Sequence, residues 1–302
     1  MVAHGLILAL GWMAAAPAHP PVHAAAADTF ATATLKDRDD TVRYFHENAM
    51  SPLATILRQD FAPDGGWITI GSAADNAVVL ADSSVMPHHL RVKVEGQGFR
   101  AEVVDTAARF EADHAPTAAA TVAPGTIGVG RYRVRLSYQN APAVIVFDPR
   151  KPATAAFQGP TYWKYDARYR CVAALARESR ADTVYIESTH GQPRAALRVG
   201  RFTLRLPHGA VKLAAYRLLE PGVSDNDLGV FFMDATCGKG SYHGGRFVDV
   251  EKRPDGRYVV DLNRAYNPSC AYSPHYNCPI PPRENRLSIA IPAGESWPED
   301  SR

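Results

Sequence analysis

The feature that most constrains the fold is a succession of short segments rich in β-branched and aromatic residues, separated by Gly, Pro, Asp or Asn. Residues 90–94 (LRVKV) and 132–138 (YRVRLSY) alternate apolar and polar side chains, as a strand with one buried face does. The intervening turn at residues 95–98 (EGQG) is typical of a β-hairpin. The 22 Gly and 23 Pro residues supply the many turns that such strands need. The pattern therefore predicts a mainly β chain with sandwich or barrel architecture.

The first 27 residues have the layout of a secretory signal peptide. Residues 5–16 (GLILALGWMAAA) form an apolar run that is too short to span a bilayer, and prolines and small residues follow it. We expect cleavage near Ala24 to Ala27, which predicts a secreted or periplasmic protein. No later apolar run reaches about 18 residues, so we expect no transmembrane segment in the mature chain.

Composition and charge restrict the class of partner. The chain has 302 residues, of which 46% are hydrophobic and 21% charged, which excludes wholesale disorder. Its net charge is +2, from 33 Lys and Arg against 31 Asp and Glu. A balance this close to zero gives no reason to expect a nucleic acid partner.

The four cysteines all lie in the second half of the chain, at positions 171, 237, 270 and 278. In an exported chain they can close two disulfides, with three possible connectivities. A local bridge between Cys270 and Cys278 encloses the loop AYSPHYN and leaves Cys171 with Cys237. The spacing lacks a Cys-x-x-Cys pair and is unlike that of a zinc site, so we expect disulfides and no metal.

The first half carries a second pattern. Residues 70–80 (IGSAADNAVVL), followed by His89, resemble the core of a forkhead-associated (FHA) domain. The resemblance implies a β-sandwich, a fold that binds phosphothreonine in that family. However, Ser72 stands where the family has its phosphate-contacting Arg, and Met86 stands in place of the family's Ser. Because Ser cannot provide the bidentate clamp of an Arg, we expect no phosphothreonine peptide as a partner.

The densest motifs lie between residues 234 and 287: DAT at 234–236, GRF at 245–247, DLNRAYNPSC at 261–270 and ENRL at 284–287. These motifs closely resemble the signature of the domain of unknown function 1684 family, a group of bacterial proteins. The resemblance covers roughly residues 52–294 and implies no established reaction. The resemblance implies that Cys270 and Cys278 form the cysteine pair that is more widespread among family members. Family members usually have Ser in place of Cys237 and no Cys in place of Cys171. Because both unusual cysteines occur in this chain, they fit a disulfide with each other that other members lack.

The two resemblances and the strand pattern together predict the fold class. We expect an FHA-like β-sandwich followed by a second β-sandwich or barrel-like unit with a long ordered loop, which runs from residue 263 to 286. A charged, proline-containing segment at residues 148–152 (DPRKP) is the best boundary. The expected divisions are the signal peptide (1–27), a tail with a short helix at about 36–47 (28–50), the FHA-like unit (51–148), the C-terminal β domain (149–295) and a tail (296–302).

Cationic and amide side chains gather around a Gly-rich turn at residues 238–241 (GKGS). Such turns present backbone N–H groups, which together with arginine and lysine bind anions. We therefore expect a small anionic molecule as the ligand of the C-terminal domain. The alternative is a buried salt-bridge network of Arg246, Asp261, Arg264 and Asp234. The expected ligand-binding residues are Lys239, Tyr242, Arg246, Asn263, Arg264 and Asn267.

An enzymatic function stays open at this point. Ser241 is a weak candidate nucleophile of a hydrolase, with His243 or His275 as the base and Asp234 as the carboxylate. No motif calls for a cofactor, because the GKGS turn lacks the spacing of a P-loop. A third possibility is an envelope scaffold that binds other proteins through its sheet edges.

Overall fold

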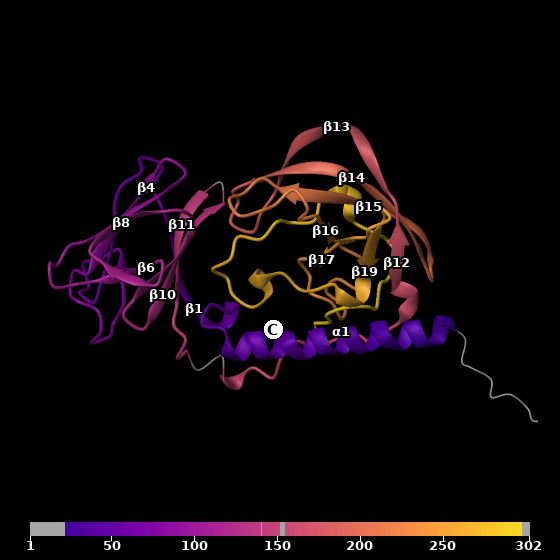
Figure 1. Ribbon diagram of the computed structural model, residues 1–302, viewed down its shortest axis with the longest axis horizontal. Helices are drawn as coiled ribbons and strands as arrows, with labels where there is room; N and C mark the ends of the chain where they lie inside the picture. Colours follow the sequence, from indigo (N-terminus) through magenta and orange to yellow (C-terminus); the bar gives the residue numbers. More distant parts are fainter. Residues whose placement is uncertain (1–21, 140, 152–154, 298–302) are drawn as a thin grey trace, which may run out of the picture.

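The computed structural model describes residues 22–139, 141–151 and 155–297, and they form two β units and one long helix (Figure 1). The chain is mainly β, as the strand pattern predicts. Of the predicted leader at residues 1–27, residues 1–21 lie outside the described residues, and residues 22–27 form the start of the long helix. No helix among the described residues has both the length and the apolar character to cross a membrane.

The first unit is a sandwich of a six-stranded and a five-stranded sheet, with strand orders β1-β11-β10-β9-β6-β7 and β3-β2-β4-β5-β8. All neighbours are antiparallel except β2 and β3. The strands are β1 (Thr55–Asp60), β2 (Ile68–Gly71), β3 (Val78–Val79), β4 (Leu90–Glu95), β5 (Gly98–Val103), β6 (Phe110–Ala112), β7 (Ala115–Thr117), β8 (Ala119–Val122), β9 (Gly125–Val129), β10 (Tyr132–Gln139) and β11 (Ala141–Phe147).

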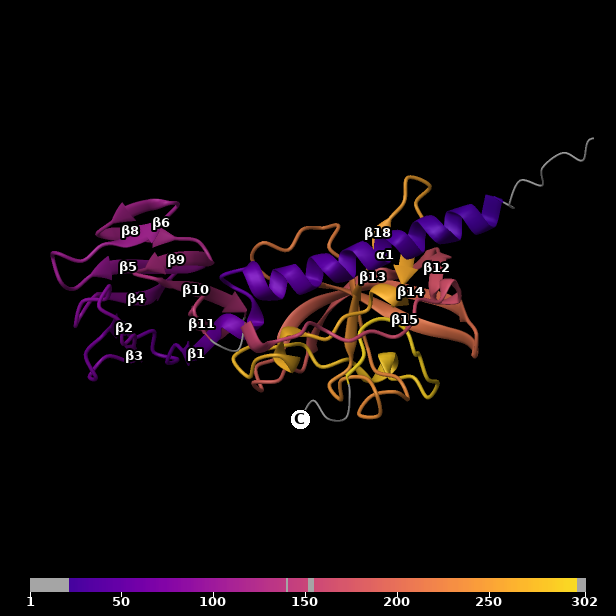
Figure 2. The ribbon, with the colours of Figure 1, turned by 90° about the horizontal axis from the view of Figure 1, so that it is seen from below.

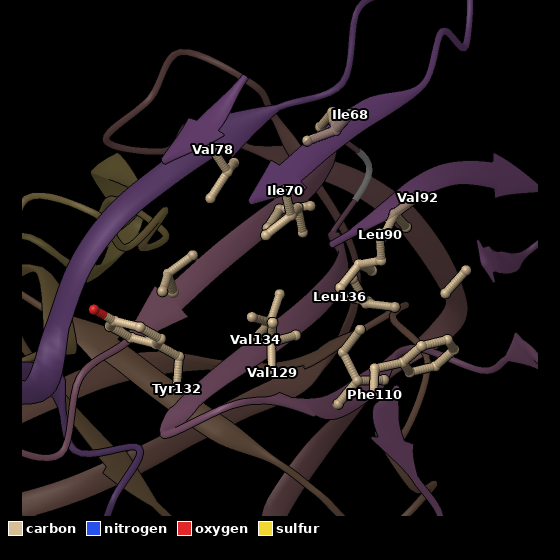
Figure 3. Close-up of a cluster of buried hydrophobic side chains, with 14 of the residues drawn as sticks. Ile68, Ile70, Val78, Leu90, Val92, Phe110, Val129, Tyr132, Val134 and Leu136 are labelled. Carbon is tan, nitrogen blue, oxygen red and sulfur yellow. The ribbon is translucent and has the colours of Figure 1, made fainter. Parts of the chain in front are cut away.

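The alternation in the sequence explains the core of this sandwich. Leu90 and Val92 of β4 and Val134 and Leu136 of β10 point inward and meet between the two sheets, as Figure 3 shows. Because side chains alternate faces along a strand, the intervening arginines and lysine remain at the surface of the two sheets.

The two residues that match the FHA pattern have structural roles. A Cβ on Gly71 would lie 2.1 Å from the carbonyl oxygen of Pro87, so only glycine fits this close approach. His89 is buried; its Nδ1 accepts a hydrogen bond from the N–H of Met86, and its Nε2 donates to the carbonyl of Arg109. These contacts join the turn to the neighbouring strands.

The second unit contains a five-stranded antiparallel sheet, β13-β14-β15-β16-β17, and a three-stranded sheet, β12-β19-β18. The long loop from residue 263 to 286 is ordered, as predicted, and contains two 3₁₀ turns at Ser269–Ala271 and Arg283–Asn285. The strands are β12 (Arg170–Ala173), β13 (Leu175–Ile186), β14 (Arg194–Leu206), β15 (Gly209–Leu218), β16 (Gly229–Phe232), β17 (Arg246–Asp249), β18 (Glu251–Lys252) and β19 (Tyr258–Asp261).

Helix α1 (Val22–Glu47) runs along the second unit in both views (Figures 1 and 2). The predicted helix at about 36–47 is present and ends at Glu47, but its expected start is wrong: it begins at Val22, and it packs against the fold. Its alanine-rich first half has high helix propensity but little amphipathic period, which hides it from pattern analysis. The ring of Phe45 packs 4.6 Å from that of Tyr272, and Arg170 lies 3.6 Å above the ring of Phe30.

Candidate functional site

A cavity of about 540 Å³ lies between α1 and the loops that follow β19. We call it the α1 cavity, because α1 forms one of its walls. Its residues come from both ends of the chain. Its α1 wall consists of Thr34, Asp37, Arg38, Thr41, Tyr44 and Phe45. The opposite side is formed by Pro52, Tyr162, Asp249, Asn263, Arg264, Ala265, Tyr266, Asn267, Ser269, Tyr272 and Glu295.

Arg38 provides the cationic group of this cavity. Its guanidinium lies 4.5 Å above the centre of the Tyr162 ring, and its Nη2 donates to the carbonyl of Asn263 at 3.4 Å. Its Nε is buried and has no hydrogen-bond partner among the described residues. Burial lowers the pKa of Arg38 from its ordinary value, but an arginine remains charged. A charged donor is therefore available to a bound molecule.

Glu295 is the carboxyl group at the floor of the cavity and is only 3% exposed. Its Oε2 accepts hydrogen bonds from the Asn267 N–H at 2.7 Å and from the Tyr272 hydroxyl at 2.8 Å. Burial raises the pKa of Glu295 to about 7, although these two donors and the charge of Arg246 oppose the shift. The carboxyl therefore exchanges its proton near neutral pH.

Three of the six predicted ligand-binding residues line the cavity: Asn263, Arg264 and Asn267. The side chain of Asn263 is committed to the fold, because its Nδ2 donates to Asp166 O and Asp261 Oδ1. Arg264 forms an ion pair with Asp37 of α1. Asn267 donates to the carbonyl of Ser296, whereas its buried Oδ1 has no partner among the described residues.

The other three predicted ligand-binding residues, Arg246, Lys239 and Tyr242, do not line the α1 cavity. Arg246 is fully buried, and its Nη2 contacts Asp234 Oδ1 at 3.3 Å and donates to the carbonyl of Ile291 at 2.9 Å. Of the predicted alternative network, the buried Arg246–Asp234 salt bridge is observed. Its other two members pair elsewhere: Arg264 with Asp37, and Asp261 with Arg170 at 3.7 Å. The turn that carries Lys239 and Tyr242 packs elsewhere: Lys239 is exposed, and the ring of Tyr242 lies 5.4 Å from that of Trp297.

The candidate catalytic residues are not assembled into a hydrolase site. Ser241 Oγ is buried and donates to Thr236 Oγ1 at 2.8 Å, and neither predicted histidine is among its hydrogen-bond partners in the described part of the chain. Thr236 in turn donates to Asp234 at 2.8 Å. His243 stacks on Tyr242. The pKa of His275 is lowered, mainly by burial and then by Lys151, which places it in different surroundings.

All four cysteines are free thiols in the structure. Cys278 Sγ accepts a hydrogen bond from the N–H of Cys270 at 3.1 Å, so these two residues are adjacent as predicted. The other two thiols have separate partners: Cys171 donates to the carbonyl of Arg205 at 3.6 Å, and Cys237 donates to Asp234 at 3.5 Å. Different strands and turns hold these two thiols, which their sequence positions do not reveal.

Sequence reasoning missed three residues that shape the cavity: Arg38, Tyr162 and Glu295. Arg38 lies on a helix that was expected to begin at about residue 36, and its polar neighbours give no sign of a buried contact. Glu295 falls at the last position of the predicted domain, in a segment without a motif. The group of tyrosines in the long loop is the one signal that points to a cavity there.

The family model described as "Protein of unknown function (DUF1684)" matches residues 155–296. A search of curated proteins found no match. Among solved structures, an uncharacterized protein from Haloarcula marismortui is 31% identical, with a TM-score of 0.40 over 48% of this chain and 80% of that chain. The FhaA FHA domain is 20% identical, with a TM-score of 0.22 over 28% of this chain and 85% of that domain.

Proposed function

Since the chain belongs to the DUF1684 family of proteins of unknown function, we propose its function from its own cavity: the protein binds a small carboxylate that also carries a hydrogen-bond donor. The proposal retains the anionic ligand expected from the sequence. It moves the binding group from the Gly-rich turn to Arg38 of α1 and Asn267 of the long loop.

The observation that carries the proposal is a pair of unsatisfied polar atoms in one cavity. Arg38 Nε is a donor and Asn267 Oδ1 is an acceptor, and both are buried without a hydrogen-bond partner among the described residues. An unsatisfied buried polar atom costs about 1–3 kcal/mol. A hydroxy acid offers an acceptor to Arg38 and a donor to Asn267, and thus satisfies both atoms.

The charges of the cavity favour a carboxylate over a phosphate. Arg264 is neutralised by Asp37, whereas Arg38 has no ion pair among the described residues. One available cation matches one negative charge. A doubly charged phosphate would meet Asp37, Asp249 and an ionised Glu295 in the same cavity, which adds repulsion. A protonated Glu295 can instead donate a hydrogen bond to a carboxylate.

Calorimetric titration of the full chain with lactate, its neutral amide lactamide and inorganic phosphate tests the proposal. We expect lactate to bind, and lactamide and phosphate to bind at least about tenfold more weakly, because lactamide lacks the negative charge that matches Arg38 and phosphate is repelled by the carboxylates of the cavity. The variant Arg38→Gln should lose about tenfold in lactate affinity. Arg43→Gln is the matched control, because Arg43 is an exposed residue of the same helix and pairs with Asp40.

Two outcomes decide the proposal. Lactate binding that falls in Arg38→Gln and is retained in Arg43→Gln supports it. Equal binding of lactate and lactamide, or an Arg38→Gln variant with unchanged affinity, overturns the assignment of Arg38. Circular dichroism of both variants shows whether α1 stays folded, so that a lost helix is recognised as such.

We infer in addition that the protein is exported and that Cys270 and Cys278 join in a disulfide after export. The apolar run at residues 5–16 supports export, and the 3.1 Å contact between Cys270 N and Cys278 Sγ supports the bridge. Cleavage between Ala24 and Ala27 leaves every α1 residue that lines the cavity, of which the first is Thr34.

Intact-mass and peptide analysis of the protein recovered from outside the cytoplasm, with and without reduction, tests both inferences. A mature chain that begins after residue 24 to 27, with a peptide that joins Cys270 to Cys278, is the expected result. An intact leader in a chain retained in the cytoplasm contradicts export. Two alkylated thiols at these positions in exported protein contradict the bridge.

A further inference from the structure

A second cavity, of about 430 Å³, adjoins the first. We call it the apolar cavity, because its walls are mainly hydrocarbon: Leu218, Val223, Leu228, Phe231, Phe247 and Val250. Tyr266 and Asp249 line both cavities and therefore lie between them.

We propose that the two cavities form one site for an amphipathic carboxylate, with the carboxylate at Arg38 and an alkyl or aryl tail in the apolar cavity. This inference rests on the proposed function and names its ligand class. Both cavities together give room for a head group and a chain of several carbon atoms.

A row of aromatic rings connects the two spaces. The ring of Tyr266 lies 6.0 Å from that of Phe247, edge to face, and Phe247 lies 4.7 Å from Phe231. Phe231 continues to Tyr216 at 6.1 Å in a stacked arrangement. This surface provides no hydrogen bonds along most of its length, so it is suited to a chain and not to a second polar group.

The charges fix the direction of the ligand. The cation of the apolar cavity is Arg194, and Glu220 pairs with it through two hydrogen bonds of 2.5 Å. Its Nη1 also donates to the carbonyl of Asn277 at 3.1 Å. Arg194 is thus occupied, whereas the Nε of Arg38 is available. The carboxylate of the ligand therefore binds in the α1 cavity, and the tail of the ligand points away from Arg38.

The hydroxyl of Tyr266 is held only weakly, which allows its side chain to rotate. Its backbone is fixed, because Tyr266 and Phe247 exchange backbone hydrogen bonds of 2.8 and 2.9 Å. Its hydroxyl contacts the two carboxylate oxygens of Asp249 at 3.2 and 3.4 Å, which is long for an O–H···O bond. Asp249 is exposed, so water can replace the tyrosine hydroxyl. Rotation of the ring to admit a tail therefore costs about one weak hydrogen bond and the edge-to-face contact with Phe247.

Titration with straight-chain 2-hydroxy acids that share the head group of lactate tests the proposal. We use the four-, six- and eight-carbon acids, together with 1-octanol as a chain without the head group. The expected gain is about two- to fourfold in affinity for each added methylene that enters the apolar cavity. 1-Octanol should bind far more weakly than the eight-carbon acid.

The variant Val223→Trp places a large ring in the apolar cavity from a partly exposed loop position. It should abolish the gain in affinity with chain length, so that the eight-carbon acid binds the variant no better than lactate does. Val104→Trp, at an exposed site in the first unit, is the matched control and should keep the gain. Tyr266→Phe should strengthen binding of the eight-carbon acid more than that of lactate.

The outcomes separate the two proposals. If lactate binds and longer acids bind no better, the proposed function stands and the amphipathic ligand is overturned. If longer acids bind better and Val223→Trp keeps the gain, the tail lies elsewhere and the apolar cavity is overturned as its site. If no 2-hydroxy acid binds at all, both proposals fail.

Discussion

The hydroxyl of Tyr272 donates a hydrogen bond of 2.8 Å to the Oε2 of Glu295, and the two side chains come from the long loop and from the C-terminal end of the described chain. Tyr272 also packs its ring 4.6 Å from that of Phe45 on α1. One tyrosine therefore links the buried carboxyl to the helix that closes the cavity.

The first prediction concerns the pH dependence of stability. Glu295 has a pKa of about 7 in the fold, above the ordinary value of 4.5. The folded state therefore binds more protons than the unfolded state between these values. Its stabilising effect is complete below about pH 4.5 and is lost as the pH rises to about 7. The free energy of unfolding should fall by on the order of 3 kcal/mol over this interval from Glu295 alone.

Urea denaturation at pH 5 and pH 8 measures this effect, and Glu295→Gln provides the comparison. The glutamine keeps an acceptor for Asn267 N–H and the Tyr272 hydroxyl but does not titrate. We expect the variant to lose less stability than the wild type between these two pH values. An identical pH profile for both proteins would contradict the raised pKa.

The second prediction concerns the buried ion pair. Arg246→Ala leaves Asp234 buried without its cation and also frees the carbonyl of Ile291. We expect a loss of about 3–5 kcal/mol in the free energy of unfolding. Arg257→Ala is the matched control, because Arg257 pairs with Asp255 at the surface, and it should cost about 0–1 kcal/mol. Similar costs for both variants, measured by urea denaturation, would show that burial does not decide the effect.

The third prediction concerns Asn285, which is completely buried in the long loop. Its Nδ2 donates to the carbonyls of Ala214 at 2.9 Å and Phe231 at 2.8 Å, and its Oδ1 accepts from Ala214 N at 2.7 Å. Asn285→Asp replaces the amide donors by a carboxylate oxygen that faces two carbonyl oxygens. We expect a destabilisation of about 3 kcal/mol or more, visible as a lower Tm. A Tm equal to that of the wild type is the contrary result.

The fourth prediction concerns the attachment of α1. Phe45 is 4% exposed and packs against Phe157 and Tyr272. Phe45→Ala should lower the free energy of unfolding by about 3–5 kcal/mol, because it leaves an empty space between the rings that hold the helix. Amide hydrogen exchange should accelerate in residues 29–47 and stay unchanged in β10. Tyr44→Ala, the exposed neighbour, should have a smaller effect, and equal acceleration in both variants would argue against this contact.

Much of the fold follows from local patterns. The alternation at residues 90–94 and 132–138 predicts β4 and β10, because the period of two in a strand is visible in any short window. Gly71 and His89 point to the turns of the sandwich for the same local reason. The motifs at 261–270 and 284–287 identify the family, and their turn residues predict an ordered loop.

The candidate site is different, because its residues are far apart in the sequence. Arg38 contacts Asn263 across 225 positions, and no local pattern encodes such a contact. Arg246 looks like an anion-binding residue by type, yet burial against Asp234 makes it part of the core. The sequence by itself determined the β architecture and the family, because both follow from local chemistry, whereas export stays a prediction. Only the tertiary structure decided which charges are paired and which are available, because pairing depends on distances between distant segments.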